Sequence, residues 1–133
     1  MCLSALSQLL PNGTNHRTML MTHYKRGDVL VTDFPFVDRG ITKRRPVLCI
    51  AHITPQKGTT LYWVLMITST ETKGWHGDIN IDNYKAVGLP VPSIIRTAKI
   101  ACIDGTLITK KVGSVDASTH DTVIKSVQVA ITN

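Results

Sequence analysis

Strand-like patterning runs through this chain from residue 29 to residue 115, and a helical period occurs only after it. Apolar residues alternate with polar ones or form short continuous runs that end at turn-forming residues, which is typical of β-strands. No helical segment separates the runs, which argues against the parallel sheet of a βαβ protein. The pattern predicts a mainly β domain, a small curved sheet or barrel of about seven strands. The runs cover residues 29–32, 47–51, 61–67, 78–82, 93–96, 99–103, 106–108 and 113–115.

A single amphipathic helix is predicted at the C-terminus. Apolar side chains recur there at helical intervals, and Ser118 is the expected N-cap, with Asp121 three residues further on. Because only one face of this helix is apolar, we expect it to cover one side of the sheet. Its apolar positions are Val123, Ile124, Val127, Ala130 and Ile131.

The length of the chain fits one domain. With 133 residues, a chain can bury roughly two-thirds of its unfolded surface, so its core needs no disulfide or metal. Aromatic residues make up only 5% of the chain, against 43% for all hydrophobic residues, so the core should be built from Val, Ile and Leu. Cys2, Cys49 and Cys102 are widely spaced, and the latter two lie in apolar runs where a thiol acts as a small hydrophobe. This cysteine usage predicts a reduced, cytoplasmic protein.

The first 22 residues differ from the rest because they do not alternate like the strands that follow. We expect either a disordered N-terminal arm or a start-site artefact, since Met19 or Met21 could each begin the compact domain. The predicted boundaries are therefore 1–22 for the arm and 23–133 for the domain. The chain has no uncharged stretch of about eighteen apolar residues, so no membrane span is predicted.

The chain is basic, with a formal charge of +6 and a pI near 9.5. Such a balance either serves solubility alone or attracts a polyanion such as nucleic acid. The run Lys43-Arg44-Arg45-Pro46 leads directly into the apolar run 47–51. Arginines at the mouth of a buried strand favour an anionic partner, and a guanidinium binds two phosphate oxygens at once.

Several common site chemistries have no support in the sequence. There is no GxxxxGK[ST] or GxGxxG loop to hold a nucleotide. The five histidines lie at unrelated spacings, without a CxxC or HxxxH pair, so no metal site is predicted. His76 is the histidine best placed to meet a ligand, because it follows Trp75 on a polar loop between Gly74 and Gly77.

Four short motifs occur in an order and at spacings that point to a known family. Taken together, over Tyr24 to Ile131, the chain resembles the MazF/PemK family of toxin endoribonucleases. The motifs are Gly27-Asp28-Val29-Leu30, Arg45-Pro46-Val47-Leu48, Ile67-Thr68-Ser69 and Ile103-Asp104.

This resemblance implies an SH3-like β-barrel with a C-terminal helix, the fold that MazF toxins share with the CcdB family. It also implies a homodimer whose interface groove takes single-stranded RNA such as mRNA. Members of the family cut RNA without a metal or other cofactor. A cognate antitoxin inhibits them by placing a disordered tail in the same groove, which is folding on binding. The expected function is that of the toxin in a type II toxin-antitoxin system.

By the same resemblance, Arg45 is the catalytic arginine and Thr68 supplies a hydroxyl that contacts the same phosphate. Metal-free cleavage uses the neighbouring 2′-OH as nucleophile and leaves a 2′,3′-cyclic phosphate and a 5′-OH. The guanidinium would neutralise the charge that grows on the phosphoryl oxygens. On spacing alone, ordinary strand-end roles are favoured for both residues, and the two side chains converge only if their strands are neighbours.

Further contacts with RNA are expected around these two residues. Departures from the family pattern leave the general base open: Ala98 stands where some members carry an acid, and Ala101-Cys102 replaces Arg-Thr. Arg39 lies near the place of a loop histidine that other members have. The base is then the catalytic arginine itself, an aspartate such as Asp38, or a water. The expected RNA-binding residues are Arg39, Lys43, Arg44, Ser69, His76 and Arg96.

Three functions are therefore compatible with the sequence. The first is a metal-independent endoribonuclease, and the second is a non-catalytic module of the same fold that binds nucleic acid or protein. The third is a gyrase poison, because the CcdB family shares the fold. CcdB-like toxins act through a C-terminal Trp-Gly-Ile, whereas this chain ends Ile131-Thr132-Asn133, which argues against the third function.

Overall fold

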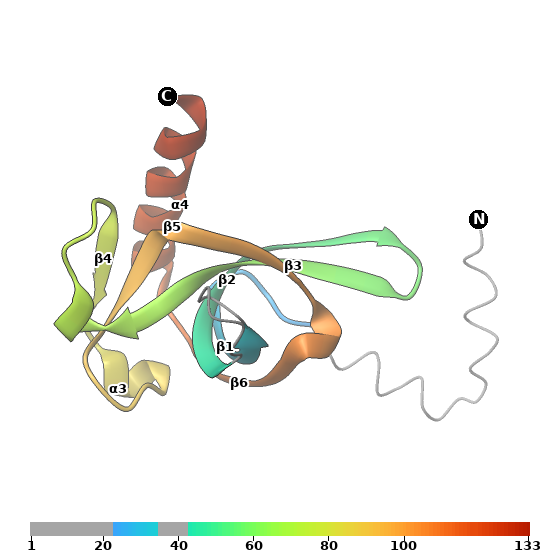
Figure 1. Cartoon of the computed structure of the whole chain (residues 1–133), viewed down its shortest axis with the longest axis horizontal. Helices are drawn as coiled ribbons and strands as arrows, with labels where there is room; N and C mark the ends of the chain where they lie inside the picture. The colour runs from blue at the N-terminus through green and yellow to red at the C-terminus, as the bar shows by residue number, and fades with distance from the viewer. Residues whose placement is uncertain (1–22, 35–42) are drawn as a thin grey trace.

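One antiparallel sheet forms the body of the molecule in the computed structural model, which describes residues 23–34 and 43–133. Its six strands lie in the order β4-β5-β3-β2-β1-β6, and a long helix follows the last of them (Figure 1). The predicted mainly β class with a C-terminal helix is thus confirmed. The elements are β1 (Asp28–Phe34), β2 (Lys43–Gln56), β3 (Thr59–Ser69), η1 (Thr70–Thr72), β4 (Asp78–Ile81), α3 (Tyr84–Val87), β5 (Ser93–Asp104), η2 (Gly105–Leu107), β6 (Ile108–Ser114) and α4 (Ala117–Thr132).

Two of the predicted strands are a single strand in the structure. The runs 93–96 and 99–103 both belong to β5, which carries an irregularity between them. Two adjacent residues of β3 pair with Arg96 and Ile100, so residues 97–99 are extra on the β5 side. A bulge of this kind bends a strand without ending it. The run 106–108 falls largely in η2, and the run 113–115 falls at the end of β6, so the described residues form six strands where about seven were expected.

The sheet is open, because β4 and β6 form its two edges. The short helix α3 follows β4 and packs against β6, the opposite edge strand. A Cβ on Gly113 of β6 would collide with the carbonyl oxygen of Val87 in α3, and one on Gly88 would collide with that of Val112. Glycine at these two positions therefore lets α3 approach β6 closely. The expected barrel is an open, curved sheet whose two edges are linked through α3.

The core consists of two clusters on the two faces of the sheet, because successive residues of a strand point to opposite faces. In β3, Leu65 and Ile67 belong to one cluster, and Tyr62 and Val64 to the other. The first cluster includes the fully buried Val123 of α4. We call the side of Leu65 and Ile67 the α4 face, and the side of Tyr62 and Val64 the opposite face.

The two described cysteines have different environments. Cys49 is buried in the cluster on the opposite face. Burial raises the pKa of its thiol to about 11, so the thiol is protonated at neutral pH and acts as the expected small hydrophobe. Cys102 is exposed, so the same expectation was wrong for this residue.

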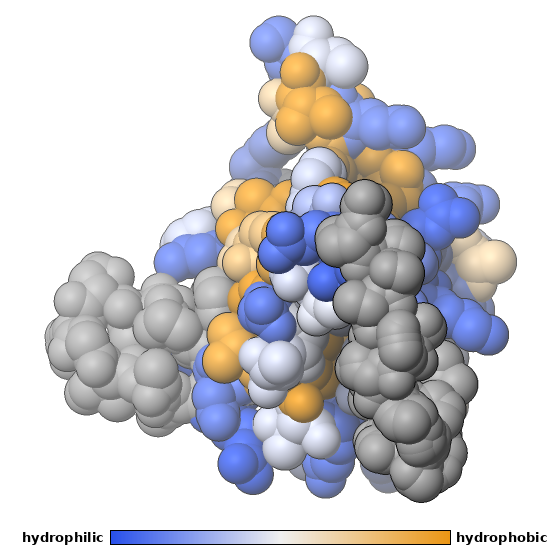
Figure 2. Space-filling view, turned by 90° about the vertical axis from the view of Figure 1, so that its right-hand side faces the viewer, coloured by the Kyte–Doolittle hydropathy of each residue, from blue (hydrophilic) through white to orange (hydrophobic). Residues whose placement is uncertain are grey.

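The helix α4 begins earlier than predicted. Asp116 is its N-cap, and the carboxylate accepts a hydrogen bond of 2.7 Å from the backbone N–H of Thr119. Ser118, the predicted N-cap, lies inside the first turn. Towards its end α4 leaves the sheet, and Val129 and Ile131 are 59% and 75% exposed. Apolar residues gather there, at the top of the view in Figure 2. No helix in the described part of the chain is long and apolar enough to cross a membrane.

Candidate functional site

Strand register brings Arg45 and Thr68 to the same end of the sheet. β2 and β3 are hydrogen-bonded neighbours, and Val47 pairs with Met66. Val47–Met66 is the last pair in this direction, and Arg45 and Thr68 each lie two residues beyond it, at the same end of the sheet. Because side chains alternate, both lie on the opposite face, the one without α4. The sequence-based condition that their strands are neighbours is met.

The side chain of Arg45 is half-buried near the start of β2, beside β1. In the strand register, Arg45 of β2 lies opposite Thr32 of β1. The side chain of Thr32 is fully buried, and its hydroxyl donates to the carbonyl of Leu107. The Nε of Arg45 is buried and has no hydrogen-bond partner among the described residues. A buried donor of this kind costs free energy unless something pairs with it. This position therefore favours an anionic or acceptor ligand.

Arg44 has a different environment from Arg45. It lies on the α4 face, and its Nε is 3.4 Å from Oδ1 of Asp33. Both side chains are more than half exposed, at 63% and 54%. Exposed pairs of this kind contribute little to stability, so Arg44 can exchange Asp33 for another anion at low cost.

The hydroxyl groups after β3 form a local hydrogen-bond network. Thr68 Oγ1 lies 3.2 Å from Thr72 Oγ1, and Thr72 donates its hydroxyl to the carbonyl of Ser69 at 3.1 Å. Thr68 is thus the donor to Thr72, which leaves lone pairs of its own oxygen free. Ser69 caps η1, because its hydroxyl oxygen accepts from the N–H of Glu71.

Arg96 is buried and makes a two-point ion pair with Asp78 across β4 and β5. Nε and Nη2 of Arg96 lie 3.1 Å and 2.9 Å from the two carboxylate oxygens, and Nη2 also donates to the carbonyl of Thr72 at 2.6 Å. The side chains are only 6% and 9% exposed. The hydrogen bond from Arg96 is the main cause that lowers the pKa of Asp78, and backbone N–H groups of Trp75 and Gly74 lower it further. Asp78 is thus the acidic partner of Arg96 in this chain.

The loop between η1 and β4 is organised around Asp78. Its Oδ2 accepts from the backbone N–H groups of Gly74 and Trp75 at 3.1 and 3.0 Å. The indole of Trp75 lies over the guanidinium of Arg96, with 4.2 Å between the ring centroid and Cζ. His76 is exposed next to it. A chain of contacts therefore joins Thr68, through Thr72 and Arg96, to this loop.

The sequence predicted roles for Arg45, Thr68 and Arg96, which stay predictions, but it gave no sign of the contacts made by Asp78 and Thr72. Asp78 was noted only as the first residue of an alternating run. Its pairing with Arg96, 18 residues away, depends on the antiparallel contact of β4 with β5. A local pattern does not contain that contact, so the ion pair could not be predicted.

A family model for the PemK-like, MazF-like toxin of type II toxin-antitoxin systems matches residues 25–131. This match covers most of the 133-residue chain. The chain belongs to this toxin family. The resemblance of the four sequence motifs is thereby confirmed.

Solved structures of MazF proteins share the fold of this family member at low sequence identity. The toxin MazF-mt6 of Mycobacterium tuberculosis is 20% identical, with a TM-score of 0.61 over 78% of this chain and 95% of that one. The MazE-MazF structure from Deinococcus radiodurans is 14% identical, with a TM-score of 0.61 over 82% and 95%. A mycobacterial endoribonuclease in complex with its cognate antitoxin is 14% identical, with a TM-score of 0.60 over 82% and 95%. No curated protein sequence matches the chain.

Some predicted site residues of this toxin family member lie outside the described residues. Arg39 and Asp38 are among them, as is the N-terminal arm, 1–22. Lys43 is described only through its backbone pairing with Phe34 in β1. The predicted roles of these residues in RNA binding or proton transfer stay predictions.

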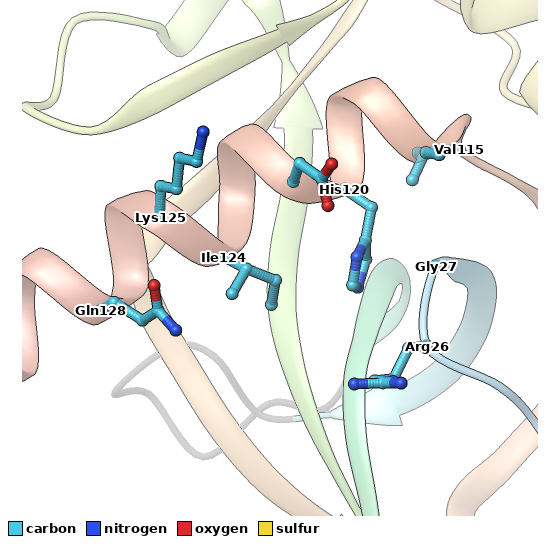
Figure 3. A pocket seen from close by; sticks show the side chains of 9 residues that line it. Arg26, Gly27, Val115, His120, Ile124, Lys125 and Gln128 are labelled. Atoms are coloured by element: carbon cyan, nitrogen blue, oxygen red, sulfur yellow. The ribbon is translucent and has the colours of Figure 1, made fainter.

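A groove of about 580 Å³ lies away from Arg45, between α4 and the turn that precedes β1. Figure 3 shows His120 extending from α4 toward Gly27, with Arg26 nearby. The Nε2 of His120 is buried without a partner in the described part of the chain. Lys125 lines the same groove, and Asp121 offsets part of the positive charge. The sequence alone gave no sign of this groove.

Proposed function

We propose that this family member is an endoribonuclease that cuts single-stranded RNA, including mRNA, without a metal or other cofactor. The observation that carries the proposal is the position of Arg45, whose buried Nε has no partner among the described residues and which lies at the same end of the sheet as Thr68. A phosphate would supply the missing acceptor. The net charge of +6 supports a polyanionic substrate.

In the proposed reaction the 2′ oxygen attacks the adjacent phosphorus. The new bond from the 2′ oxygen to phosphorus forms as the bond from phosphorus to the 5′ oxygen breaks. The 2′-OH proton goes to a base, and the 5′ oxygen takes up a proton, so the products are a 2′,3′-cyclic phosphate and a 5′-OH. Arg45 stabilises the charge on the phosphoryl oxygens, and Thr68 orients the same group. The base is Arg45 itself, Asp38 or a water.

We further propose that the protein acts in the cytoplasm as a homodimer and is inhibited by a cognate antitoxin. Two similar structures contain a MazE protein or a cognate antitoxin, which supports such a partner. Large apolar side chains that remain exposed support contact with a second copy. They include Trp63, Ile100, Val129 and Ile131.

The test is cleavage of a mixed-sequence RNA by purified protein in the presence of EDTA. We expect wild-type protein to cut, and Arg45→Ala to lower the rate by at least about a hundredfold, as loss of a donor to a developing oxyanion does. Arg26→Ala removes an exposed arginine away from the site and should cut like wild type. Light scattering on the same samples should give twice the chain mass of 14.6 kDa.

Other outcomes of this experiment would favour the other functions. RNA that is bound but left intact by a folded dimer would indicate a non-catalytic module, which the missing acid at Ala98 would explain. Loss of supercoiling activity when gyrase is mixed with the protein would indicate a gyrase poison. Equal cleavage by wild type and Arg45→Ala would contradict the role proposed for the arginine.

A further inference from the structure

Trp75 combines high exposure with a fixed position. Its side chain is 48% exposed, although a tryptophan that packs only within its own protein is usually well covered. The backbone on either side is held, because Asp78 accepts hydrogen bonds from the N–H groups of both Gly74 and Trp75. The indole is thus presented to the surroundings in a defined orientation.

The neighbours of the indole are cationic. Cζ of Arg96 lies 4.2 Å and Nζ of Lys99 5.8 Å from the ring centroid, within the range of cation–π contacts. Arg96 is itself fixed by Asp78 and by the carbonyl of Thr72. The surface around Trp75 therefore offers an aromatic plane and positive charge together.

Trp75 belongs to the same part of the molecule as Arg45 and Thr68. Arg96 pairs with Met66 of β3, so its side chain lies on the opposite face, as do those of Thr68 and Arg45. Hydrogen bonds from Thr68 to Thr72 and from Arg96 to Thr72 link the strand end to the loop of Trp75. A ligand whose phosphate reaches Arg45 would therefore extend along the face that carries the indole.

The second tryptophan of the chain, Trp63, has apolar rather than cationic surroundings. Trp63 is similarly exposed, at 43%, but it shares a small depression of about 320 Å³ with Ile100, Ala101 and Cys102. That surface is apolar and lies on the α4 face, which suits a protein partner. The cationic surroundings of Trp75 suit a nucleotide instead, because single-stranded nucleic acid combines stacking bases with phosphates.

We infer that Trp75 is a stacking platform for one base of single-stranded RNA, bound beside the phosphate held at Arg45. This inference rests on the proposed endoribonuclease function. It adds a residue that binds a base of the substrate in addition to those that bind its phosphate. Arg96 and Asp78 are then positioning residues, since they fix the loop and the ring without touching the base. Lys99 would contact the adjacent backbone phosphate.

Reciprocal single-tryptophan proteins provide the first test, in an Arg45→Ala background that prevents cleavage. Trp63→Phe leaves only the indole of Trp75, whose fluorescence should be quenched when a mixed-sequence, single-stranded oligoribonucleotide is added. Trp75→Phe is the matched control, and its remaining indole at Trp63 should respond little. Equal quenching of both proteins would overturn the inference, as would quenching confined to Trp63.

Affinity measurements provide the second test in the same Arg45→Ala background. Trp75→Ala should weaken binding by roughly 5- to 150-fold, the range for loss of one stacked base, and Trp75→Phe should restore most of it. An oligonucleotide that is abasic at the stacked position should bind Trp75→Ala and parent protein alike. A merely structural role for the indole would not produce this dependence on the base.

The outcomes separate the inference from the function on which it rests. RNA cleavage by wild type together with unchanged RNA binding by Trp75→Ala would overturn the stacking role alone. A loss of antitoxin binding without a loss of RNA binding would assign Trp75 to a protein contact and would also overturn it. A wild-type protein that neither binds nor cuts RNA would overturn both.

Discussion

At the scale of residues, two arginines on one face of the sheet have opposite environments. The side chain of Arg96 is 6% exposed, and its guanidinium donates to both oxygens of Asp78 and to the carbonyl of Thr72. Arg45 keeps a buried Nε without a partner in the part of the chain that the structure describes. A paired charge stabilises a structure, whereas an unpaired donor can bind a phosphate. The structure thus leaves a buried donor open to a ligand at Arg45 and not at Arg96, and the predicted RNA binding by both arginines stays a prediction.

The ion pair of Arg96 with Asp78 should make the stability of the fold depend on pH. The pKa of Asp78 is lowered in the folded state, so its stabilising effect is complete above the unfolded pKa of about 3.9 and is lost as pH falls through the folded value. Asp78→Asn leaves the buried Arg96 without its charge partner. At neutral pH it should lower the free energy of unfolding by about 3 kcal/mol.

Urea unfolding from pH 7 to pH 2 measures this effect. The difference between wild type and Asp78→Asn should begin to narrow below about pH 4, where the carboxyl of the unfolded chain takes up a proton, and should be lost once the pH falls below the lowered pKa of the folded state. Asp82→Asn is a substitution at an exposed aspartate, and its free energy of unfolding should follow that of wild type at all pH values. A gap between Asp78→Asn and wild type that stays constant down to pH 2 would show that the ion pair does not stabilise the fold.

At the scale of elements, the periodicity of apolar residues in the sequence predicted helices and strands well, whereas the sequence said little about which strands pair and in which register. The alternation of β4 and the apolar run of β3 predicted strands, and the helical stripe predicted α4. The bulge in β5 was not predicted, because residues 97–99 are extra only relative to the register of β3. Arg45 and Thr68 were identified from family motifs, but their position at the same end of the sheet depends on the pairing of β2 with β3.

The start of α4 shows the same limit on a smaller scale. Both Asp116 and Ser118 have side chains that favour an N-cap, so residue type alone could not decide between them. The carboxylate of Asp116 reaches the N–H of Thr119, and α4 therefore begins at Ala117. Only Val115 separates the N-cap Asp116 from the end of β6, and Val115 lies next to the turn at Gly27.

Removal of the Asp116 N-cap should measurably lower the stability of the protein. Asp116→Ala removes the acceptor for the N–H of Thr119 and should lower the free energy of unfolding by about 1 kcal/mol, with a fall in Tm of about 4–8 °C. Asp121→Ala, on the same helix but without a capping role, is the matched control. Thermal unfolding followed by circular dichroism compares the two, and equal Tm values for both variants would contradict the N-cap assignment.

At the scale of the whole molecule, the two faces of the sheet differ in what they can bind. The opposite face carries Arg45, Thr68 and the loop of Trp75, which together offer hydroxyls, an aromatic plane and a guanidinium donor that no other described residue pairs with. The α4 face is covered in part by the helix and leaves apolar side chains exposed. That the opposite face takes the RNA is part of the proposed function, and membership of the PemK-like, MazF-like toxin family does not by itself assign a role to either face.

The most direct test of the account is analysis of the RNA ends by mass spectrometry. Wild-type protein should cut a mixed-sequence RNA to fragments with 2′,3′-cyclic phosphate and 5′-OH ends, and it should leave the same RNA intact when every 2′-OH is methylated. This result is expected because the 2′ oxygen is the proposed nucleophile at the phosphate held by Arg45. Cleavage of the methylated RNA, or fragments with 5′-phosphate ends, would contradict the account.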